Sequence, residues 1–220
     1  MLNDFLRSPR GTRALPEHAV KGFLRQCGIP VPRGVFVPRG APLPDLSPLG
    51  FPLIAKVSSS QIRSKSDVGG LRFGLADQQG AEAAIVQLMA IETAEGVLVE
   101  EQAAPGVEVI VGGITDSQFG PVVMFGLGGV FVELFHDVAF APAPMTRDDA
   151  FKLMPRVTAY RLLTGYRGKP PCDLDSLADI LVIISELMAT GLLEEIDLNP
   201  VTVYSRGALI LDAKMLVAQG

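Results

Sequence analysis

The 220-residue sequence lacks the marks of several specialised classes of protein. It has two cysteines, Cys27 and Cys172, far apart and without a CxxC spacing or a neighbouring histidine, so reduced thiols are expected. No apolar run approaches the ~18 residues that a transmembrane helix needs. The N-terminus also lacks the basic and apolar segments of a signal peptide. These absences favour a cytoplasmic protein.

Positive charge is scarce as well. The chain has 19 Lys and Arg against 24 Asp and Glu, a net charge of -5, which argues against a nucleic-acid-binding protein. No GxxxxGK[ST] phosphate loop occurs, and residues 126–129 lack the third glycine and the following helix of a dinucleotide fingerprint. What the chain does have is 48% hydrophobic residues, enough for one large domain or two small lobes.

Oxygen-bearing side chains alternate with apolar ones near the C-terminus. If residues 193–199 form a strand, Glu195, Asp197 and Asn199 project to one face. Such a face can hold a hard cation such as Mg²⁺, or it can be a solvated strand edge. The spacing alone favours neither interpretation.

Asp212 follows on the next expected strand, residues 208–216. A two-residue loop at Ser205 and Arg206 would place Asn199 opposite Asp212. A three-residue loop that includes Gly207 would shift the pairing by one residue. The sequence leaves both registers open.

Lys56 interrupts an apolar strand pattern over residues 51–57. Either it is buried and has an anionic partner, or it reaches water from an edge strand. Residues 58–70 then form a segment rich in hydroxyls, cations and glycines, which could cradle phosphate oxygens or be an ordinary loop. Its candidate phosphate contacts are Arg63, Lys65, Gly69 and Gly70.

The remaining pattern indicates an α+β architecture whose two lobes meet near residue 100. Asp77 and Asp173 are expected helix caps. Glu108 lies in an apolar strand pattern and would need a hydrogen-bonding partner, such as a ribose hydroxyl pair or a local cation. The expected helices span residues 16–27, 77–93, 146–163 and 173–190, and the expected strands span 33–37, 51–57, 71–75, 96–101, 106–111, 122–125 and 130–135.

Six short motifs occur in one order along the chain. They are Lys65-Ser-Asp-Val-Gly-Gly70, Phe119-Gly-Pro121, Gly126-Leu-Gly-Gly129, Leu163-Thr-Gly-Tyr-Arg-Gly-Lys-Pro-Pro171, Glu195-Ile-Asp-Leu-Asn-Pro200 and Leu211-Asp-Ala-Lys214. In this order they resemble the ATP-grasp subunit or domain of NDP-forming acyl-CoA synthetases, relatives of succinyl-CoA synthetase and of ADP-forming acetate–CoA ligase. The resemblance extends from Leu15 to Val217.

The resemblance implies an ATP-grasp fold, in which two α+β lobes clamp a nucleotide. The lobes would comprise residues 15–100 and 101–220, after an N-terminal tail of residues 1–14. The implied cofactors are ATP or ADP and Mg²⁺. The implied nucleotide contacts are Lys56, Gly69 and Gly70 at the phosphates, Glu100, Glu101 and Gln102 beside the adenine, and Glu108 at the ribose. Asn199 and Asp212 match the magnesium ligands, and Asp197 matches the acid near the phosphoryl-transfer centre.

The implied activity joins a carboxylic acid to CoA at the expense of ATP, through acyl phosphate and phosphohistidine steps. The CoA site and the main phosphohistidine belong to an α component, so the resemblance implies a partner subunit. Two positions depart from the family pattern: Ser64 replaces a second phosphohistidine, and Ala141 replaces an arginine. Two alternatives therefore stay open: a nucleotide-binding or regulatory subunit without that relay, and another ATP-grasp ligase that uses an acyl phosphate.

Overall fold

The computed structural model describes residue 5 and residues 13–62, 64–128 and 137–218. The chain divides into two compact units, which are described separately. The N-terminal unit comprises Ala14–Gly22 and Pro32–Ala104, and the C-terminal unit comprises Phe23–Val31 and Pro105–Gly220 together with the residues up to Arg13. Helix α2 (Glu17–Gln26), which follows the short strand β1 (Ala14–Leu15), contributes residues to both units.

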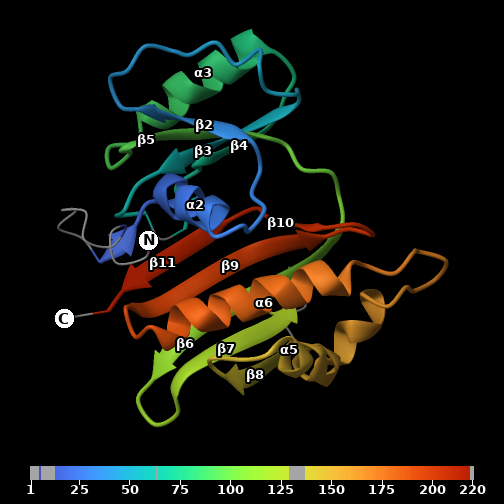
Figure 1. The fold of residues 1–220 in the computed structure, drawn as a ribbon. Helices are drawn as coiled ribbons and strands as arrows, with labels where there is room; N and C mark the ends of the chain where they lie inside the picture. Colours follow the sequence, from blue (N-terminus) through green and yellow to red (C-terminus); the bar gives the residue numbers. More distant parts are fainter. Residues whose placement is uncertain (1–4, 6–12, 63, 129–136, 219–220) are drawn as a thin grey trace. The chain divides into compact units, whose positions relative to one another are not determined.

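An antiparallel sheet with the strand order β2-β5-β3-β4 forms the N-terminal unit (Figure 1). Its strands are β2 (Gly34–Pro38), β3 (Leu53–Ser58), β4 (Leu71–Leu75) and β5 (Gly96–Glu101). Helix α3 (Gln78–Met89) packs on β3, β4 and β5. As predicted, Asp77 caps this helix, since its side chain accepts a hydrogen bond from the backbone N–H of Gly80.

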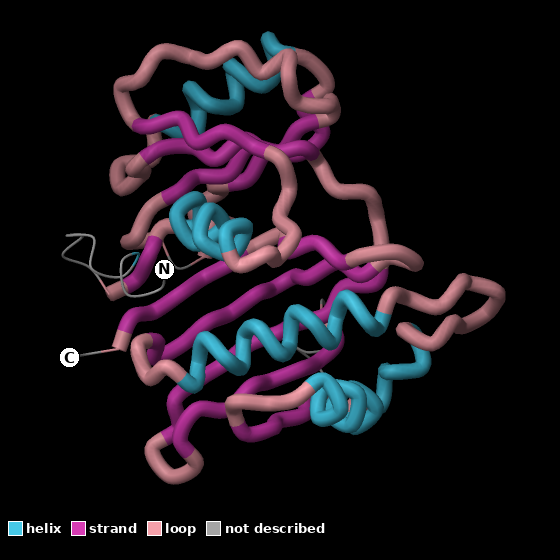
Figure 2. The backbone as a smooth tube through the Cα atoms, in the orientation of Figure 1, coloured by secondary structure: helices cyan, strands magenta, loops and turns pink. Residues whose placement is uncertain are grey.

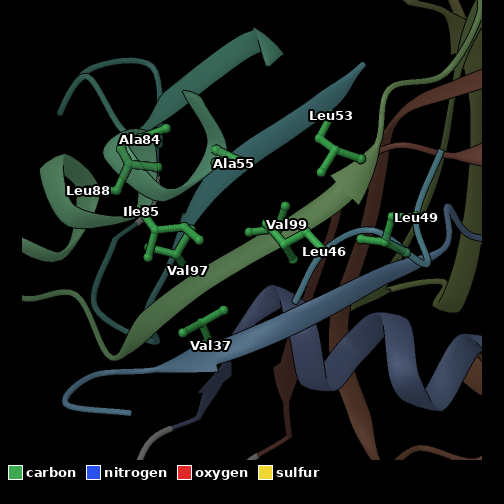
Figure 3. Packing of buried hydrophobic residues seen from close by; sticks show 11 residues of the cluster. Val37, Leu46, Leu49, Leu53, Ala55, Ala84, Ile85, Leu88, Val97 and Val99 are labelled. Carbon is green, nitrogen blue, oxygen red and sulfur yellow. The ribbon is translucent and has the colours of Figure 1, made fainter. Parts of the chain in front are cut away.

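Aliphatic side chains fill the space between α3 and this sheet (Figure 3). Leu53 and Ala55 of β3 and Val97 and Val99 of β5 belong to this core. Because successive side chains of a strand point to opposite faces, Lys56 of β3 and Glu100 of β5 share the other face of the sheet. The core thus orients two charged residues away from α3.

A second antiparallel sheet, with the order β11-β9-β6-β7-β8 and with β10 beside β9, forms the C-terminal unit. Helix α6 (Leu174–Ala189) packs against β6, β7 and β9, and α5 (Arg147–Leu153) packs against α6 (Figure 2). The strands are β6 (Val107–Asp116), β7 (Gly120–Leu127), β8 (Val138–Pro142), β9 (Leu193–Val203), β10 (Ala208–Ile210) and β11 (Ala213–Val217). Antiparallel sheets with helices in both units confirm the α+β class.

The predicted helix over residues 146–163 is shorter than expected. Helix α5 ends at Leu153 and is followed by two 3₁₀ turns, η1 (Met154–Arg156) and η2 (Thr158–Leu162). Pro155 has no backbone N–H and its ring disfavours continuation of an α-helix, which explains the break. The expected strand over residues 130–135 lies outside the described residues. Among the described helices, none has the length and apolarity that a membrane span requires.

Candidate functional site

Lys56 is a buried lysine with anionic partners. Strand β3 lies between β5 and β4, so the alternative of an edge strand is wrong. The Nζ atom of Lys56 lies 2.9 Å from Oε2 of Glu100 and 3.2 Å from Oε1 of Glu17. Two carboxylates thereby offset the cost of taking the ammonium out of water.

These three residues belong to a larger lysine–glutamate cluster, which consists of Glu17, Lys21, Lys56, Lys65 and Glu100. Nζ of Lys21 lies 2.9 Å from Oε1 of Glu17 and 2.7 Å from Oε2 of Glu100. Nζ of Lys65 lies 3.1 Å from Oε2 of Glu17. The side chains are at most 10% exposed, so the cluster is an interior ion-pair network of the N-terminal unit.

Burial and charge act in opposite directions on the carboxylate of Glu17. Burial raises its pKa, but the neighbouring Lys56, Lys21 and Lys65 outweigh burial and hold the pKa well below its ordinary value. Burial lowers the pKa of Lys21, and Glu17 and Glu100 act against that shift. Glu17 is therefore ionised over the whole physiological pH range.

Glu17 and Lys21 were not among the predicted site residues. Their signal was nevertheless present, because residues 17, 20, 21 and 24 follow the i, i+3, i+4, i+7 spacing of one helix face. Val20 and Leu24 are buried on that face, and so are Glu17 and Lys21. A charged pair on the apolar stripe of a helix indicates ionic partners in the rest of the fold.

The segment between β3 and β4 turns tightly at its glycines. The backbone N–H of Gly70 donates to the carbonyl oxygen of Lys65 at 2.6 Å, and that of Val57 donates to the carbonyl of Gly70 at 2.8 Å. A Cβ atom at Gly70 would overlap Cγ1 of Val57, and Gly69 has φ +61°. The close approach of Val57 requires glycine at position 70, and the left-handed backbone favours glycine at position 69. Arg63 lies outside the described residues.

The three residues expected beside an adenine differ in their surroundings. The side chain of Glu100 is part of the buried cluster. Oε1 of Glu101 accepts a hydrogen bond from the backbone N–H of Gly50 at 2.9 Å. Gln102 is exposed, and its Oε1 accepts the backbone N–H of Gly74 at 2.7 Å. Alternation along β5 therefore sends Glu100 and Glu101 in different directions.

The C-terminal unit contains the acidic strand face that the sequence predicted. Ile196 and Leu198 of β9 are buried, whereas Glu195 and Asn199 are exposed and Asp197 is half-buried. The alternation is that of a strand with one face in the core.

The loop after β9 has two central residues, Ser205 and Arg206. The backbone N–H of Tyr204 donates to the carbonyl oxygen of Gly207 at 3.0 Å and closes the loop. The register continues into β11, where Lys214 is opposite Asp197. Of the two registers left open by the sequence, the two-residue loop is correct.

This register places Asn199 opposite Asp212, and the backbone N–H of Asn199 donates to the carbonyl oxygen of Asp212 at 3.2 Å. Directly opposed residues have Cβ atoms roughly 5 Å apart, a separation that an amide oxygen and a carboxylate can bridge through one cation. Magnesium commonly uses one or two protein carboxylates, with waters and phosphates completing its shell. The pair fits Mg²⁺. Among the described residues, no group of three or more His, Cys, Asp or Glu is arranged to hold a metal.

Glu108 is exposed on β6, where it pairs with Thr202. Burial therefore does not force Glu108 to find a partner, because the buried Val109 points to the other face of the strand. The expected ribose or cation partner stays a prediction. The backbone of Gly128 packs against it, with its N–H donating to the carbonyl oxygen of Glu108 at 2.9 Å. An exposed carboxylate at this strand remains accessible to a ligand.

Other polar side chains have structural partners or lie outside the described residues. Nδ1 of His18 forms a hydrogen bond of 2.9 Å with Oγ of Ser58, and the ring of His18 stacks on Phe36. Asp137 accepts the backbone N–H groups of Thr158 and Ala159 at 2.8 and 2.9 Å. Glu133 and His136 lie outside the described residues. Cys27 and Cys172 are free thiols, and burial raises the pKa of both.

Comparison with known proteins identifies the family. A family model described as the ATP-grasp domain matches residues 7–217, so the chain belongs to the ATP-grasp domain family. The fold expected from the six motifs is thereby confirmed.

Two curated relatives have different lengths. The chain is 38% identical over 216 residues to "Acetate--CoA ligase [ADP-forming] I subunit beta" of Pyrococcus furiosus. This match covers 93% of this chain and 92% of that subunit. It is 39% identical over 206 residues to "Acetate--CoA ligase [ADP-forming] II" of Archaeoglobus fulgidus. This match covers 93% of this chain but only 30% of that longer protein. The chain thus spans nearly all of one relative and about a third of the other.

Solved structures of an acetyl-coenzyme A synthetase from Ca. Korarchaeum cryptofilum are also similar. One, in complex with coenzyme A, Ca-AMPCP and HgCl⁺, gives a TM-score of 0.88 at 38% identity and covers 99% of this chain and 98% of that one. Another, in complex with coenzyme A and Mg-AMPPCP, has its phosphohistidine segment pointing towards the nucleotide-binding site. It gives a TM-score of 0.83 at 40% identity and covers 94% of both chains.

Proposed function

We propose that this chain is the ATP-grasp β subunit of an ADP-forming acid–CoA ligase that works with a separate CoA-binding α subunit. The enzyme would convert a carboxylic acid, CoA and ATP into acyl-CoA, ADP and phosphate. The observation that carries the proposal is the match over 92% of the length of a β subunit of such a ligase, at 38% identity.

Within this proposal, the N-terminal lobe (residues 15–100) supplies the phosphate contacts. Lys56 and Lys65 provide positive charge, and Gly69 and Gly70 let the backbone approach the phosphates. The shared contact of the two lysines with Glu17 supports this assignment, since it brings both ammonium groups to one carboxylate. The adenine would lie beside Glu100, Glu101 and Gln102, and Glu108, at the start of the C-terminal lobe (residues 101–220), would bind the ribose.

Asn199 and Asp212 would hold Mg²⁺, which neutralises charge on the nucleotide phosphates when it is bound. Asp197 points to the same face of β9 as Asn199 and has Lys214 at 4.0 Å. We assign Asp197 to the phosphoryl-transfer centre, where a carboxylate can position the group that accepts the phosphoryl.

The acid, CoA and the main phosphohistidine would be supplied by the α subunit. Two features of relatives support this division: the Archaeoglobus ligase is much longer than this chain, and the Korarchaeum synthetase has a phosphohistidine segment that points towards its nucleotide site. A hetero-oligomer in the cytoplasm is the assembly that follows.

Co-expression with a candidate α subunit tests the proposal. We expect ADP release that requires the acid, CoA and ATP together, and that neither chain produces alone. A calorimetric titration of this chain with Mg-ATP separates binding from chemistry. Absence of turnover with every cognate α subunit would overturn the assignment as a ligase subunit.

A further inference from the structure

One carboxylate in the N-terminal unit contacts two lysines that come from different segments. Oε1 of Glu17 lies 3.2 Å from Nζ of Lys56 on β3, and Oε2 lies 3.1 Å from Nζ of Lys65 in the glycine-containing segment. The side chain of Glu17 is 3% exposed, whereas those of Lys56 and Lys65 are 7% and 10% exposed. The carboxylate is thus the innermost of the three groups.

We infer that Glu17 is a positioning residue for nucleotide phosphates, which fixes the ammonium groups of Lys56 and Lys65 without touching the nucleotide itself. The inference rests on the proposed function, because it takes these two lysines as the phosphate contacts. It adds a residue from α2 that none of the six sequence motifs contains.

The physical need for such a residue follows from the two lysines. Their ammonium groups repel each other, and a carboxylate between them reduces that repulsion. A lysine side chain also has a flexible four-carbon stem, and fixing it before the ligand arrives lowers the entropy lost on binding. Glu17 provides both effects, because each of its oxygens contacts one of the lysines.

The carboxylate of Glu17 is itself held in place. Lys21, one helical turn later, contacts Oε1 of Glu17 at 2.9 Å and Oε2 of Glu100 at 2.7 Å. On the same turn of α2, the ring of His18 stacks on Phe36 with centroids 3.5 Å apart, and its Nδ1 is 2.9 Å from Oγ of Ser58. These contacts tie the first turns of α2 to β2, β3 and β5.

Two substitutions at this position separate charge from shape. Glu17→Gln keeps the length of the side chain and removes its charge, whereas Glu17→Asp keeps the charge and shortens the side chain by one methylene. If Glu17 positions the lysines through its charge, the Kd for Mg-ATP rises about tenfold to a hundredfold in Glu17→Gln. The aspartate restores most of the affinity. If the residue only fills space, the Kd rises more in Glu17→Asp than in Glu17→Gln.

A double-mutant cycle with Lys65→Met shows whether Glu17 acts through that lysine. We expect Glu17→Gln to raise the Kd by a smaller factor in the Lys65→Met background than in the wild-type chain, because one of the two groups to be positioned is gone and only Lys56 remains. The inference is overturned if the factors by which the two single variants raise the Kd multiply in the double variant. It is also overturned if Glu17→Gln alone leaves the Kd unchanged. Glu92→Gln, an exposed glutamate of the same unit, is the matched control.

The experiment uses the whole chain and calorimetric Mg-ATP titration, with a thermal melt of each variant. Should Glu17→Gln fail to fold, the cycle is run with Glu17→Asp and Lys65→Met, and additive losses again count against the inference. A wild-type chain that binds no Mg-ATP overturns the proposed function together with this inference. Wild-type binding that Glu17→Gln leaves unchanged overturns the inference alone.

Discussion

Asn199 and Asp212 occupy opposite positions on two antiparallel segments, joined by the hydrogen bond from the backbone N–H of Asn199 to the carbonyl oxygen of Asp212. A loop with two central residues sets this register, and a slip by one residue would turn one of the two side chains into the core. The proposed magnesium pair therefore depends on the geometry of the loop at Ser205 and Arg206.

Asp212→Asn should weaken Mg²⁺ binding. The amide keeps an oxygen ligand but removes its charge, so we expect the Mg²⁺ concentration needed for nucleotide binding to rise at least about tenfold. A Mg²⁺ titration at fixed ATP concentration, followed by calorimetry, measures this. Glu195→Gln is the control, since Glu195 is exposed on the same strand face and has no assigned role. If both variants raise the required Mg²⁺ concentration equally, the loss of negative charge and not the loss of a metal ligand at position 212 is the cause.

Asp197→Asn should reduce turnover more than binding. We expect kcat of the complete enzyme to fall by about a hundredfold, with the Kd for Mg-ATP changed by less than about threefold, because we propose that the carboxylate acts at the transferring group. Steady-state ADP release with the α subunit gives kcat, and calorimetry gives the Kd. Undiminished turnover would show that the catalytic assignment of Asp197 is wrong.

Gly70→Ala should disturb the segment between β3 and β4. The added methyl would overlap Cγ1 of Val57, whose side chain is buried, and would crowd the carbonyl oxygen of Lys65. We expect a loss of about 1–3 kcal/mol in the free energy of unfolding together with weaker Mg-ATP binding. Gly22→Ala is the matched control: nothing lies within 4 Å of the added methyl, and alanine is favoured inside a helix. It should stabilise the chain slightly. A Gly70→Ala variant that matches wild type in both assays would contradict the packing described above.

Asp173 should contribute stability that depends on pH. Its carboxylate accepts the backbone N–H groups of Gly207 at 2.7 Å and Ser176 at 3.0 Å, and these bonds lower its pKa. A lowered folded-state pKa gives stability that is fully present above the unfolded pKa of about 4 and is lost as pH falls through the folded pKa. Asp173→Ala should cost about 1–2 kcal/mol at neutral pH.

The measurement for Asp173→Ala is urea unfolding at pH 7 and near pH 3. The difference from wild type should shrink at the lower pH, because the carboxylate is then increasingly protonated in the wild-type protein as well. Glu186→Ala, at an exposed position of the same helix, should show no such pH dependence. A difference that stays constant with pH would mean that Asp173 acts through packing.

Local patterns were enough for much of the fold. The caps at Asp77 and Asp173, the alternation along β9 and the apolar stripes of α3 and α6 were predictable, because each depends on residues a few positions apart. The predicted helix after Thr146 was too long, because Pro155 lacks the backbone N–H that an α-helix needs and the helix ends before it. The exposure of Glu108 was missed for a different reason: apolar neighbours in sequence say little about which face of a strand a residue occupies.

By itself, the sequence determined the family, through six motifs in order, and the α+β class, through the periods of its apolar residues. Tertiary structure alone decided which charged groups meet. The pairing of Asn199 with Asp212 required the loop geometry, and the contacts of Glu17 with Lys56 and Lys65 required the tertiary fold to bring the first turn of α2 to these lysines. Helix and strand periodicity is a local property, whereas burial of an ion-pair network depends on partners 39 and 48 positions away, which no local pattern encodes.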